Sequence, residues 1–379
     1  MDGNAVPVGR GFAPRGNEEA VLPLLRGAAS LSLTELVGLT RLSRPTVEEA
    51  VSGLVGRSLV RVIPPESEDG RKAGRPARRF AFRPEVGHVV ACDMGVELAR
   101  VLVTRLDGGS VGRGEVALAA TLGVKERLAA VVEAVDALLG RAGLSRDEVW
   151  AVGVATTGIV DAAGTVVLSS RLPELTGVSL ADLWAERFPG AVVRVGNDAR
   201  CAALAEHWIG AAVDVDDSVT VLAGTALAAA ITLGGEPYRG SHGASGEVGG
   251  VAELGWSRAV AALRELYSAA GPDELPAGGA EVDYSDPQVR ALLAAFVEAL
   301  TPGLVTLVSV IDPPRVIFGG EVAAAGAALT GPLRDVLAAG CLFPVEVVAS
   351  SLGDDSSLLG ALREALNEVD AVLGRPLPA

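Results

Sequence analysis

The sequence predicts an α/β protein with a small N-terminal domain and a larger body made of two lobes. Three helical patterns followed by two β-rich runs lie within residues 17–86. From residue 87 onward strand patterns alternate with helical patterns, and the alternation repeats in a second half. A chain of 379 residues also exceeds the usual size of a single hydrophobic core. Two such halves suggest two lobes around a cleft.

Changes in composition and pattern divide the chain into segments. The first residues are rich in Gly and Pro, and we expect them to be disordered. The predicted segments are a tail (1–16), the N-terminal domain (17–86), the body (87–379), its first lobe (87–198 with the C-terminal helix 357–372) and its second lobe (199–356).

Charge is divided unevenly along the chain. Residues 1–86 carry 13 Lys and Arg against 10 Asp and Glu, whereas the remaining residues carry 19 against 37. A net charge of +3 is therefore attached to one of −18, which together give the total of −15. This asymmetry indicates a small module that binds a polyanion, joined to an acidic body that repels nucleic acid.

The N-terminal domain begins with helical patterns that carry their own start signals. A short helix is predicted over 18–26. In "SLTELVGL", Ser32 and Glu35 form a capping box, and Ser43 caps a further helix, "RPTVEEAVSGLVGRS". Pro45 lies in the first turn of that helix, where its missing N–H costs nothing. Two short helices joined by a tight turn predict a helix-turn-helix. The buried stripe of its second helix is predicted to be Val47, Val51, Leu54 and Val55.

Two β-rich runs, "LVRVI" (59–63) and "RRFAF" (78–82), follow the helices and enclose a polar loop. This pattern predicts a β-hairpin wing, whose stretch "RKAGRPARRF" holds five of the 32 Lys and Arg residues. A solvated charged loop is the alternative, but the preceding helix pair favours DNA contact. The predicted DNA-contacting residues are Ser43, Arg44, Pro45, Thr46, Glu48 and Glu49 on the recognition helix and Arg71, Lys72, Arg75, Arg78 and Arg79 on the wing.

Three Gly-containing turns could line the cleft of the body. "DMG" (93–95) ends a strand where backbone amides can hold phosphate, and "GND" (196–198) places a carboxylate at a strand-to-helix corner. "HGASGEVGG" (242–250) carries the carboxylate of Glu247. Each of these signals is weak alone, because an Asp at the start of a helix is more often structural than catalytic.

Their order and spacing resemble the ROK family, which comprises bacterial sugar kinases and sugar-responsive transcription factors with an actin-like, two-lobed ATPase fold. The resemblance covers nearly the whole chain from Glu18. "LSRPTVEEAVSGLV" is similar to the helix-turn-helix of the family's regulators, and "GRP" (74–76) to their wing. "GVATTGIVDAAGTVV" and "RGSHGASGEVGG" are similar to two body signatures of the family. Since the kinases lack the N-terminal domain, the resemblance implies a regulator with a winged helix-turn-helix.

The chain departs from the family pattern where phosphate and metal would bind. The first phosphate turn has Val96 and Glu97 in place of Gly and Thr, and the second reads "GTALA" (224–228) with two glycines lost. The position of the zinc-binding His is Gly250, and the expected cysteine run is missing after it. We therefore expect no bound ATP, no metal, no cofactor and no enzyme activity.

The resemblance implies a ligand site at Thr157, Gly158, Asn197, Asp198 and Glu247. In the kinases, the residue matching Asp198 removes a proton from a sugar hydroxyl, and in regulators it can accept that hydroxyl's hydrogen bond. Two alternatives stay open: a sugar-like ligand binds there, or the carboxylates make structural hydrogen bonds only.

These patterns together predict a cytoplasmic transcriptional regulator that binds double-stranded DNA as a homodimer or higher homo-oligomer. No apolar run reaches the ~18 residues of a membrane helix, and the N-terminus lacks the apolar core of a secretory signal. One rival is a sugar kinase with a DNA-binding arm. The other is a regulator whose body binds a protein partner, such as transcription machinery, instead of a small ligand.

Overall fold

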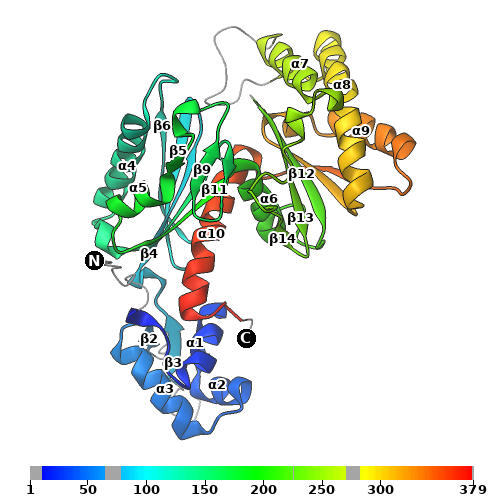
Figure 1. Cartoon of the computed structure of the whole chain (residues 1–379). Coiled ribbons are helices and arrows are strands. Elements are labelled where there is room, and N and C mark those ends of the chain that lie inside the picture. Colours follow the sequence, from blue (N-terminus) through cyan, green and yellow to red (C-terminus); the bar gives the residue numbers. More distant parts are fainter. Residues whose placement is uncertain (1–10, 65–77, 225, 270–281, 378–379) are drawn as a thin grey trace.

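A computed structural model describes residues 11–64, 78–224, 226–269 and 282–377. Figure 1 shows an N-terminal domain below a body of two lobes, with the C-terminal helix α10 (Ser356–Leu373) running between them. The predicted α/β class and its two-lobed body are confirmed.

The N-terminal domain contains three helices and a three-stranded sheet in the order β1-β3-β2. The Ser32–Glu35 capping box is present, and Ser43 Oγ accepts a hydrogen bond from the Thr46 amide. Of the predicted stripe, Val55 is only half-buried, and Ala50 is buried beside the other three. The elements are α1 (Glu18–Gly27), β1 (Leu31–Ser32), α2 (Leu33–Thr40), α3 (Arg44–Gly56), β2 (Val60–Ile63) and β3 (Arg79–Phe82).

The first lobe is built on a mixed sheet in the order β11-β7-β4-β5-β6. Strands β4 and β5 pair antiparallel. Strands β4, β7 and β11 run parallel, so the "DMG" turn after β4 and the end of β11 lie at the same end of the sheet. Sequence patterns did not indicate β6, because its alternation is interrupted by two glycines. The elements are β4 (His88–Met94), β5 (Leu98–Arg105), β6 (Ser110–Ala117), α4 (Val124–Arg141), β7 (Val149–Thr156), β8 (Ile159–Val160), β9 (Thr165–Leu168), β10 (Val178–Ser179), α5 (Leu180–Arg187) and β11 (Val192–Asn197).

The second lobe has a sheet in the order β14-β13-β12-β15-β16, and helices α7, α8 and α9 pack with it into a separate core. Helix α8 is long and apolar enough to cross a membrane by length and composition, but 44% of that stretch is buried in this core. This is weak evidence for a membrane helix, since core helices meet the same criteria. The elements are β12 (Ser218–Ala223), β13 (Leu227–Leu233), β14 (Glu236–Pro237), α7 (Trp256–Ala269), α8 (Pro287–Ile311), β15 (Arg315–Gly319), α9 (Ala327–Gly340) and β16 (Glu346–Ala349).

Helix α6 (Asp198–Ile209) lies between the two lobes (Figure 1). It packs against α10 of the first lobe and also against β12 and β13 of the second. The sequence places a lobe boundary at residues 198–199, at the start of this helix. In the structure α6 is shared, because its small residues Ala199 and Ala203 contact Ala230 on β13.

The N-terminal domain and the first lobe share one continuous hydrophobic core, which includes residues of α1, α3, β4 and α10. The ring of Phe12 stacks on Trp150 with centroids 4.8 Å apart. Residues 11–16, expected to be part of a disordered tail, are therefore ordered, because the aromatic ring of Phe12 has a partner on the body. Residues 1–10 of that tail lie outside the described part of the chain.

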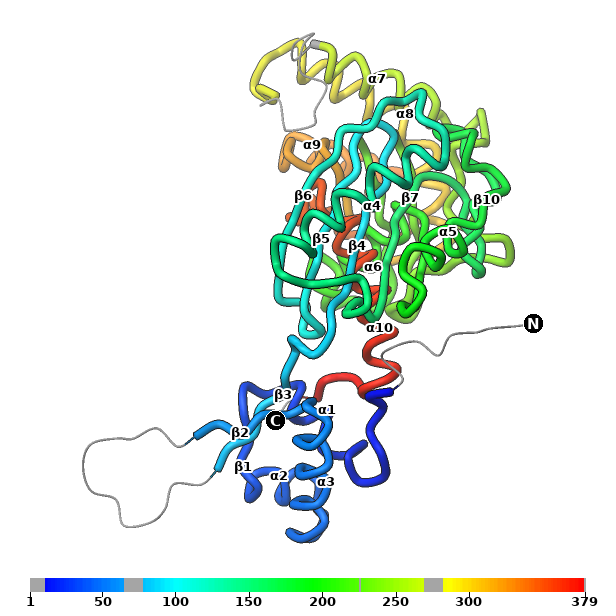
Figure 2. Tube along the Cα trace, turned by 90° about the vertical axis from the view of Figure 1, so that its left-hand side faces the viewer, coloured from blue at the N-terminus to red at the C-terminus, as the bar shows by residue number. Residues whose placement is uncertain are grey.

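The end of α10 lies beside α1 (Figure 2), and polar contacts join the two. Arg26 pairs with Asp370 at 2.9 Å, and the two side chains are only 3% and 9% exposed. Arg26 also donates to the carbonyl of Gly374, and Arg363 pairs with the same Asp370. The Leu377 amide donates to the Pro23 carbonyl at 3.0 Å. The N-terminal domain is thus attached to the C-terminal end of α10.

Helix α10 approaches its neighbours at glycines. A Cβ on Gly360 would overlap the carbonyl oxygen of Cys201 in α6, and a Cβ on Gly153 in β7 would overlap that of Ala361 in α10. The atoms that an added Cβ would meet belong to the backbone, so they cannot move aside as the end of a flexible side chain could.

We predict that Gly360→Ala lowers the free energy of unfolding by about 3 kcal/mol, because the added methyl group forces α6 and α10 apart. The matched control is Gly140→Ala at the end of α4, where a Cβ meets nothing within 4 Å. That variant should be neutral or more stable by up to about 1 kcal/mol, since alanine favours helix. Urea unfolding of both variants measures the difference, and equal effects would contradict the close packing of α10.

Candidate functional site

A cavity of about 540 Å³ lies between the lobes. Its first-lobe wall is the turn between β4 and β5 together with the start of α10. Its second-lobe wall comes from the loop after β12, the end of α7 and the Gly320–Glu321 corner after β15. Asp198, at the first position of α6, also lines it. Two of the three Gly-containing turns that the sequence singled out, "DMG" and "GND", therefore contribute to this cavity, whereas no residue of 242–250 lines it.

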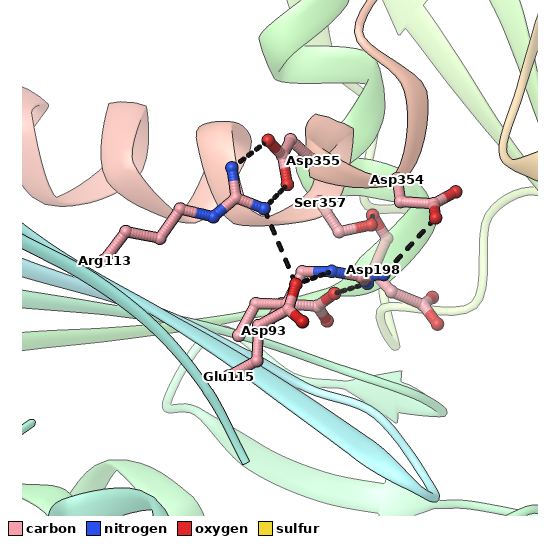
Figure 3. A network of polar contacts seen from close by, with 8 residues as sticks. Asp93, Arg113, Glu115, Asp198, Asp354, Asp355 and Ser357 are labelled. Carbon is pink, nitrogen blue, oxygen red and sulfur yellow. Dashed lines mark hydrogen bonds and ion pairs between the residues drawn. The ribbon is translucent and has the colours of Figure 1, made fainter. Parts of the chain in front are cut away.

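An arginine of β5 lies among the carboxylates at the first phosphate turn. Arg100 pairs with Asp93 at 3.8 Å, with Glu115 at 3.4 Å and with Asp354 at 3.3 Å. Beside it, Arg113 pairs with Asp355 at 2.5 Å, as Figure 3 shows. The positive charge at this turn is thus already neutralised by the protein's own carboxylates.

The second phosphate loop also faces a carboxylate. A Cβ on Gly224 would lie 2.9 Å from Oε2 of Glu321, so this carboxylate lies against the loop backbone. Burial and the nearby charge of Asp354 raise the pKa of Glu321 to about 7. The carboxyl group of Glu321 therefore lies at the second loop, as the carboxyl groups of Asp93 and Asp354 lie at the first turn.

Two more carboxyl groups of the cleft are protonated more readily than usual. Burial, followed by the charge of Asp198, raises the pKa of Asp93 to about 7. Burial raises the pKa of Asp198 to about 6, although the Ala199 amide and the Arg171 guanidinium oppose the shift. Carboxyl groups with perturbed pKa values in a cleft are typical of functional sites.

The structure brings together most of the ligand residues that the resemblance implied. Asn197 caps α6 by accepting from the Arg200 amide at 3.1 Å, and its Nδ2 donates to Gly158 O at 3.0 Å and Asp198 Oδ1 at 2.9 Å. The polar atoms of Asn197 are therefore engaged in structure. Asp198 lines the cavity, whereas Thr157, Gly158 and Asn197 do not.

Glu247 lies in the loop that the sequence assigned to the site. Arg200 donates to the carbonyls of Gly243 and Val160, both at 2.9 Å, which ties this loop to the first lobe. Burial raises the pKa of Glu247, and the charge of Arg200 opposes that shift. Glu247 is close enough to add to the raised pKa of Asp198, but it does not line the described cavity.

The predicted recognition-helix residues lie at the start of α3. Arg44 forms an i,i+4 ion pair with Glu48 at 3.0 Å, and both side chains are largely exposed. Ser43, Pro45 and Glu49 are exposed, and Thr46 is half-exposed. Glu48 therefore offsets part of the charge that Arg44 would present to DNA.

The wing residues fall into two groups. Arg71, Lys72 and Arg75 lie outside the described residues. Arg78 is exposed, whereas Arg79 donates to Ser30 Oγ and Ser30 O, both at 2.8 Å, and pairs with Glu35 at 3.2 Å. The guanidinium of Arg79 thus joins β3 to the start of β1 and to α2.

The sequence analysis did not identify Arg100, Glu321 and Tyr267, which also line the cavity. Arg100 faces Asp93 across the β4–β5 ladder, so the strand register would have revealed this pair. Glu321 and Tyr267 carry no motif signal, because their proximity to the cleft depends on the fold of the second lobe. Within the described residues, no group of three or more His, Cys, Asp or Glu could hold a metal ion.

The fold and these motifs match one family. The ROK family matches residues 89–253 and 261–368. The chain belongs to the ROK family. This ROK chain is 21% identical over 388 residues to the xylose repressor of Caldicellulosiruptor bescii, covering 93% of this chain and 96% of that protein. It is 32% identical over 232 residues to the kanosamine kinase of Amycolatopsis mediterranei, covering 56% and 75%.

Among solved structures, the fold is similar to that of a ROK family transcriptional regulator that is a homologue of the E. coli MLC protein. The TM-score is 0.69 at 18% identity, over 94% of this chain and 98% of that one. The match therefore includes the N-terminal domain as well as the two ROK lobes.

We predict that the contribution of Asp93, Asp198 and Glu321 to stability falls as pH rises from about 4 to about 7, because the folded state holds protons on these groups that the unfolded chain releases near pH 4. Asp93→Asn removes one of these groups. The loss of unfolding free energy between about pH 5 and about pH 8 should then be smaller than in the parent protein. Guanidinium unfolding at several pH values measures it, and identical pH slopes would show that Asp93 titrates normally.

Proposed function

We propose that this ROK protein is a DNA-binding transcriptional regulator whose body binds a small ligand and does not transfer phosphate. The observation that carries the proposal is an N-terminal domain packed on a ROK body in which Asp354 pairs with Arg100 at 3.3 Å and Glu321 lies against the backbone of Gly224. The full-length similarity to a xylose repressor supports the regulatory part.

DNA binding uses the exposed first turn of α3 in the major groove. Arg44 can donate to guanine or to a phosphate, and the methyl group of Thr46 can contact a thymine methyl. Glu48, paired with Arg44 in the free protein, can accept from cytosine N4 once that pair opens. A homodimer of the body would place two such helices over two half-sites.

Helix α10 offers a physical route between the cleft and the DNA-binding domain. At its start, Ser357 Oγ donates to the backbone carbonyl of Asp198 at 3.1 Å. At its other end Asp370 holds Arg26 of α1. The helix spans about 27 Å as one rigid element, so a ligand that shifts its first turn would also shift the DNA-binding domain.

We predict that Arg44→Ala and Arg78→Ala each weaken binding to captured genomic duplex fragments by about 5- to 10-fold near 0.1 M salt, because each removes an exposed cation that can contact phosphate. Arg79→Ala is the matched neighbour, and its effect should be smaller because its guanidinium is held by Ser30 and Glu35. Fluorescence anisotropy at several salt concentrations measures both affinity and salt slope. A larger loss in Arg79→Ala than in Arg78→Ala would contradict this orientation of the wing.

A sugar kinase is the second candidate, because Asp198 lies in the cleft and kinases are among the relatives. We predict no sugar-dependent ADP release from ATP, since the nucleotide phosphates would meet the carboxylates of Asp354 and Glu321. A coupled assay with a panel of hexoses tests this, with Asp198→Asn as the background control. Turnover that disappears in Asp198→Asn would identify the protein as a kinase.

A further inference from the structure

Large apolar side chains are exposed at one end of the second lobe. Leu342 is 96% exposed and Phe343 67%, both in the loop between α9 and β16, and Val310 in the last turn of α8 is 74% exposed. Val213, in the segment between α6 and β12, is also exposed. We name these four residues the apolar end surface. Single exposed apolar residues are common, but several at one place on a soluble protein indicate a contact surface.

The four residues lie at the same end of the lobe because they precede neighbouring parallel strands. Ser218 of β12 pairs with Arg315 of β15, and Arg315 pairs with Glu346 of β16, so all three strands begin at one end of the sheet. Arg315 also joins the segments before these strands. It donates to the Ala211 carbonyl at 2.6 Å and pairs with Glu346 at 2.8 Å.

The ends of α8 and α9 also meet at this end of the sheet. A Cβ on Gly340, the last residue of α9, would lie 2.8 Å from Cγ2 of Val305 in α8. The loop that carries Leu342 and Phe343 therefore leaves α9 beside the last turns of α8, which carry Val310. The interlobe cavity is at the opposite end, because the second-lobe loops that line it follow β12 and β15. The apolar end surface is thus separate from the cleft.

The charged groups around the apolar end surface are mostly acidic. Arg315 is largely covered, and it is already paired with the carboxylates of Asp214 and Glu346, which are both largely exposed. The exposed or half-exposed carboxylates at this end of the lobe are those of Asp214, Asp216, Asp217, Glu236, Asp312 and Glu346.

Two other groups near this end can carry positive charge. Arg334 is exposed on α9, about 9 Å along the helix from Gly340, and is followed by the carboxylate of Asp335. His207 lies in the last turn of α6, where its Nδ1 is 3.1 Å from the carbonyl oxygen of Ala212. These two groups and Arg315 are fewer than the six carboxylates, so the surroundings of the apolar end surface carry net negative charge.

This charge pattern decides which partner fits. In a two-fold dimer the carboxylates around one copy of the surface would face the same carboxylates of the second copy, and like charges a few ångströms apart repel. Duplex DNA and anionic lipid would be repelled for the same reason. A protein that presents apolar side chains with Lys or Arg around them would match both the apolar residues and the acidic rim.

We propose that the apolar end surface is a docking site for a different protein, whose contacting segment is apolar and flanked by Lys or Arg. Leu342 and Phe343 are the anchors of this contact, and Asp214 and Glu346 attract the basic groups around it. The proposal goes beyond the proposed function, because it uses neither the cleft nor the DNA-binding surface.

Fluorescence anisotropy of the full-length protein with three labelled peptides tests the chemistry of the partner. The first peptide is an amphipathic helix of about five turns with Leu on one face and Lys on the other. The second has Glu in place of Lys, and the third has Ser in place of Leu. Near 0.1 M salt we expect the Leu–Lys peptide to bind with a micromolar Kd and each of the other two at least about tenfold more weakly. Equal binding of either altered peptide, or no binding of the first, would overturn the proposal.

The double variant Leu342→Ser, Phe343→Ser tests the location of the contact and should weaken binding of the Leu–Lys peptide by about tenfold or more. Both side chains are exposed, so its midpoint of urea unfolding should equal that of the parent protein. The matched control is Val167→Ser, Leu168→Ser, which changes an adjacent exposed apolar pair on β9 of the first lobe. An equal loss of binding in this control would show that the peptide does not recognise the apolar end surface.

Light scattering of the same variants tests the second copy as the occupant. We expect Leu342→Ser, Phe343→Ser to keep the molecular mass of the parent protein in solution. A mass that halves in this variant and not in the control would show that a second copy covers the surface, and the proposal would fail.

Discussion

The backbone contact of α10 with β7 and α6 is the constraint on which the rest of the structure depends. Gly360 and Gly153 allow the helix to lie against its neighbours with no side chain between them. The start of α10 is thereby fixed at the cleft and its end at α1. Because backbone atoms cannot rotate away as side chains do, a displacement at one end must be carried by the whole helix.

The cleft shows that the charges at its turns can differ while the fold around them is kept. The sheet edges and the strand-to-helix corner of the first lobe remain, since they depend on strand pairing and on the cap supplied by Asn197. The charges at the two turns are set by the protein itself. Arg100 pairs with Asp93 and Asp354 at the first turn, and Glu321 lies against Gly224 at the second. The cleft keeps carboxyl groups that can accept hydrogen bonds and offers little to stabilise a phosphate. This charge pattern supports the proposed binding without phosphoryl transfer.

The junction between the N-terminal domain and the body is firm because its charges are buried in pairs. Arg26 and Asp370 are almost fully enclosed, and Arg363 contacts the same carboxylate. Breaking a buried ion pair leaves an uncompensated charge at a cost of about 3–5 kcal/mol. Together with the shared apolar core, this makes independent movement of the domain costly. The two lobes are joined by α6, which packs against both of them, and by Arg200, which holds the carbonyl of Gly243.

The sequence by itself determined the features that depend on near neighbours. The capping box at Ser32 and Glu35 and the cap at Ser43 use partners three residues away, and strands such as β4 and β7 show in their apolar runs. The replacement of glycines in the two phosphate turns could likewise be seen directly in the amino-acid sequence. Only the tertiary structure decided that Arg100 would pair with Asp93 at the first turn, that Arg79 would be held by Ser30, and that the buried hydroxyl of Tyr267 would have no hydrogen-bond partner among the described residues. These outcomes depend on strand register and on packing between segments far apart in the chain, and no local pattern encodes them.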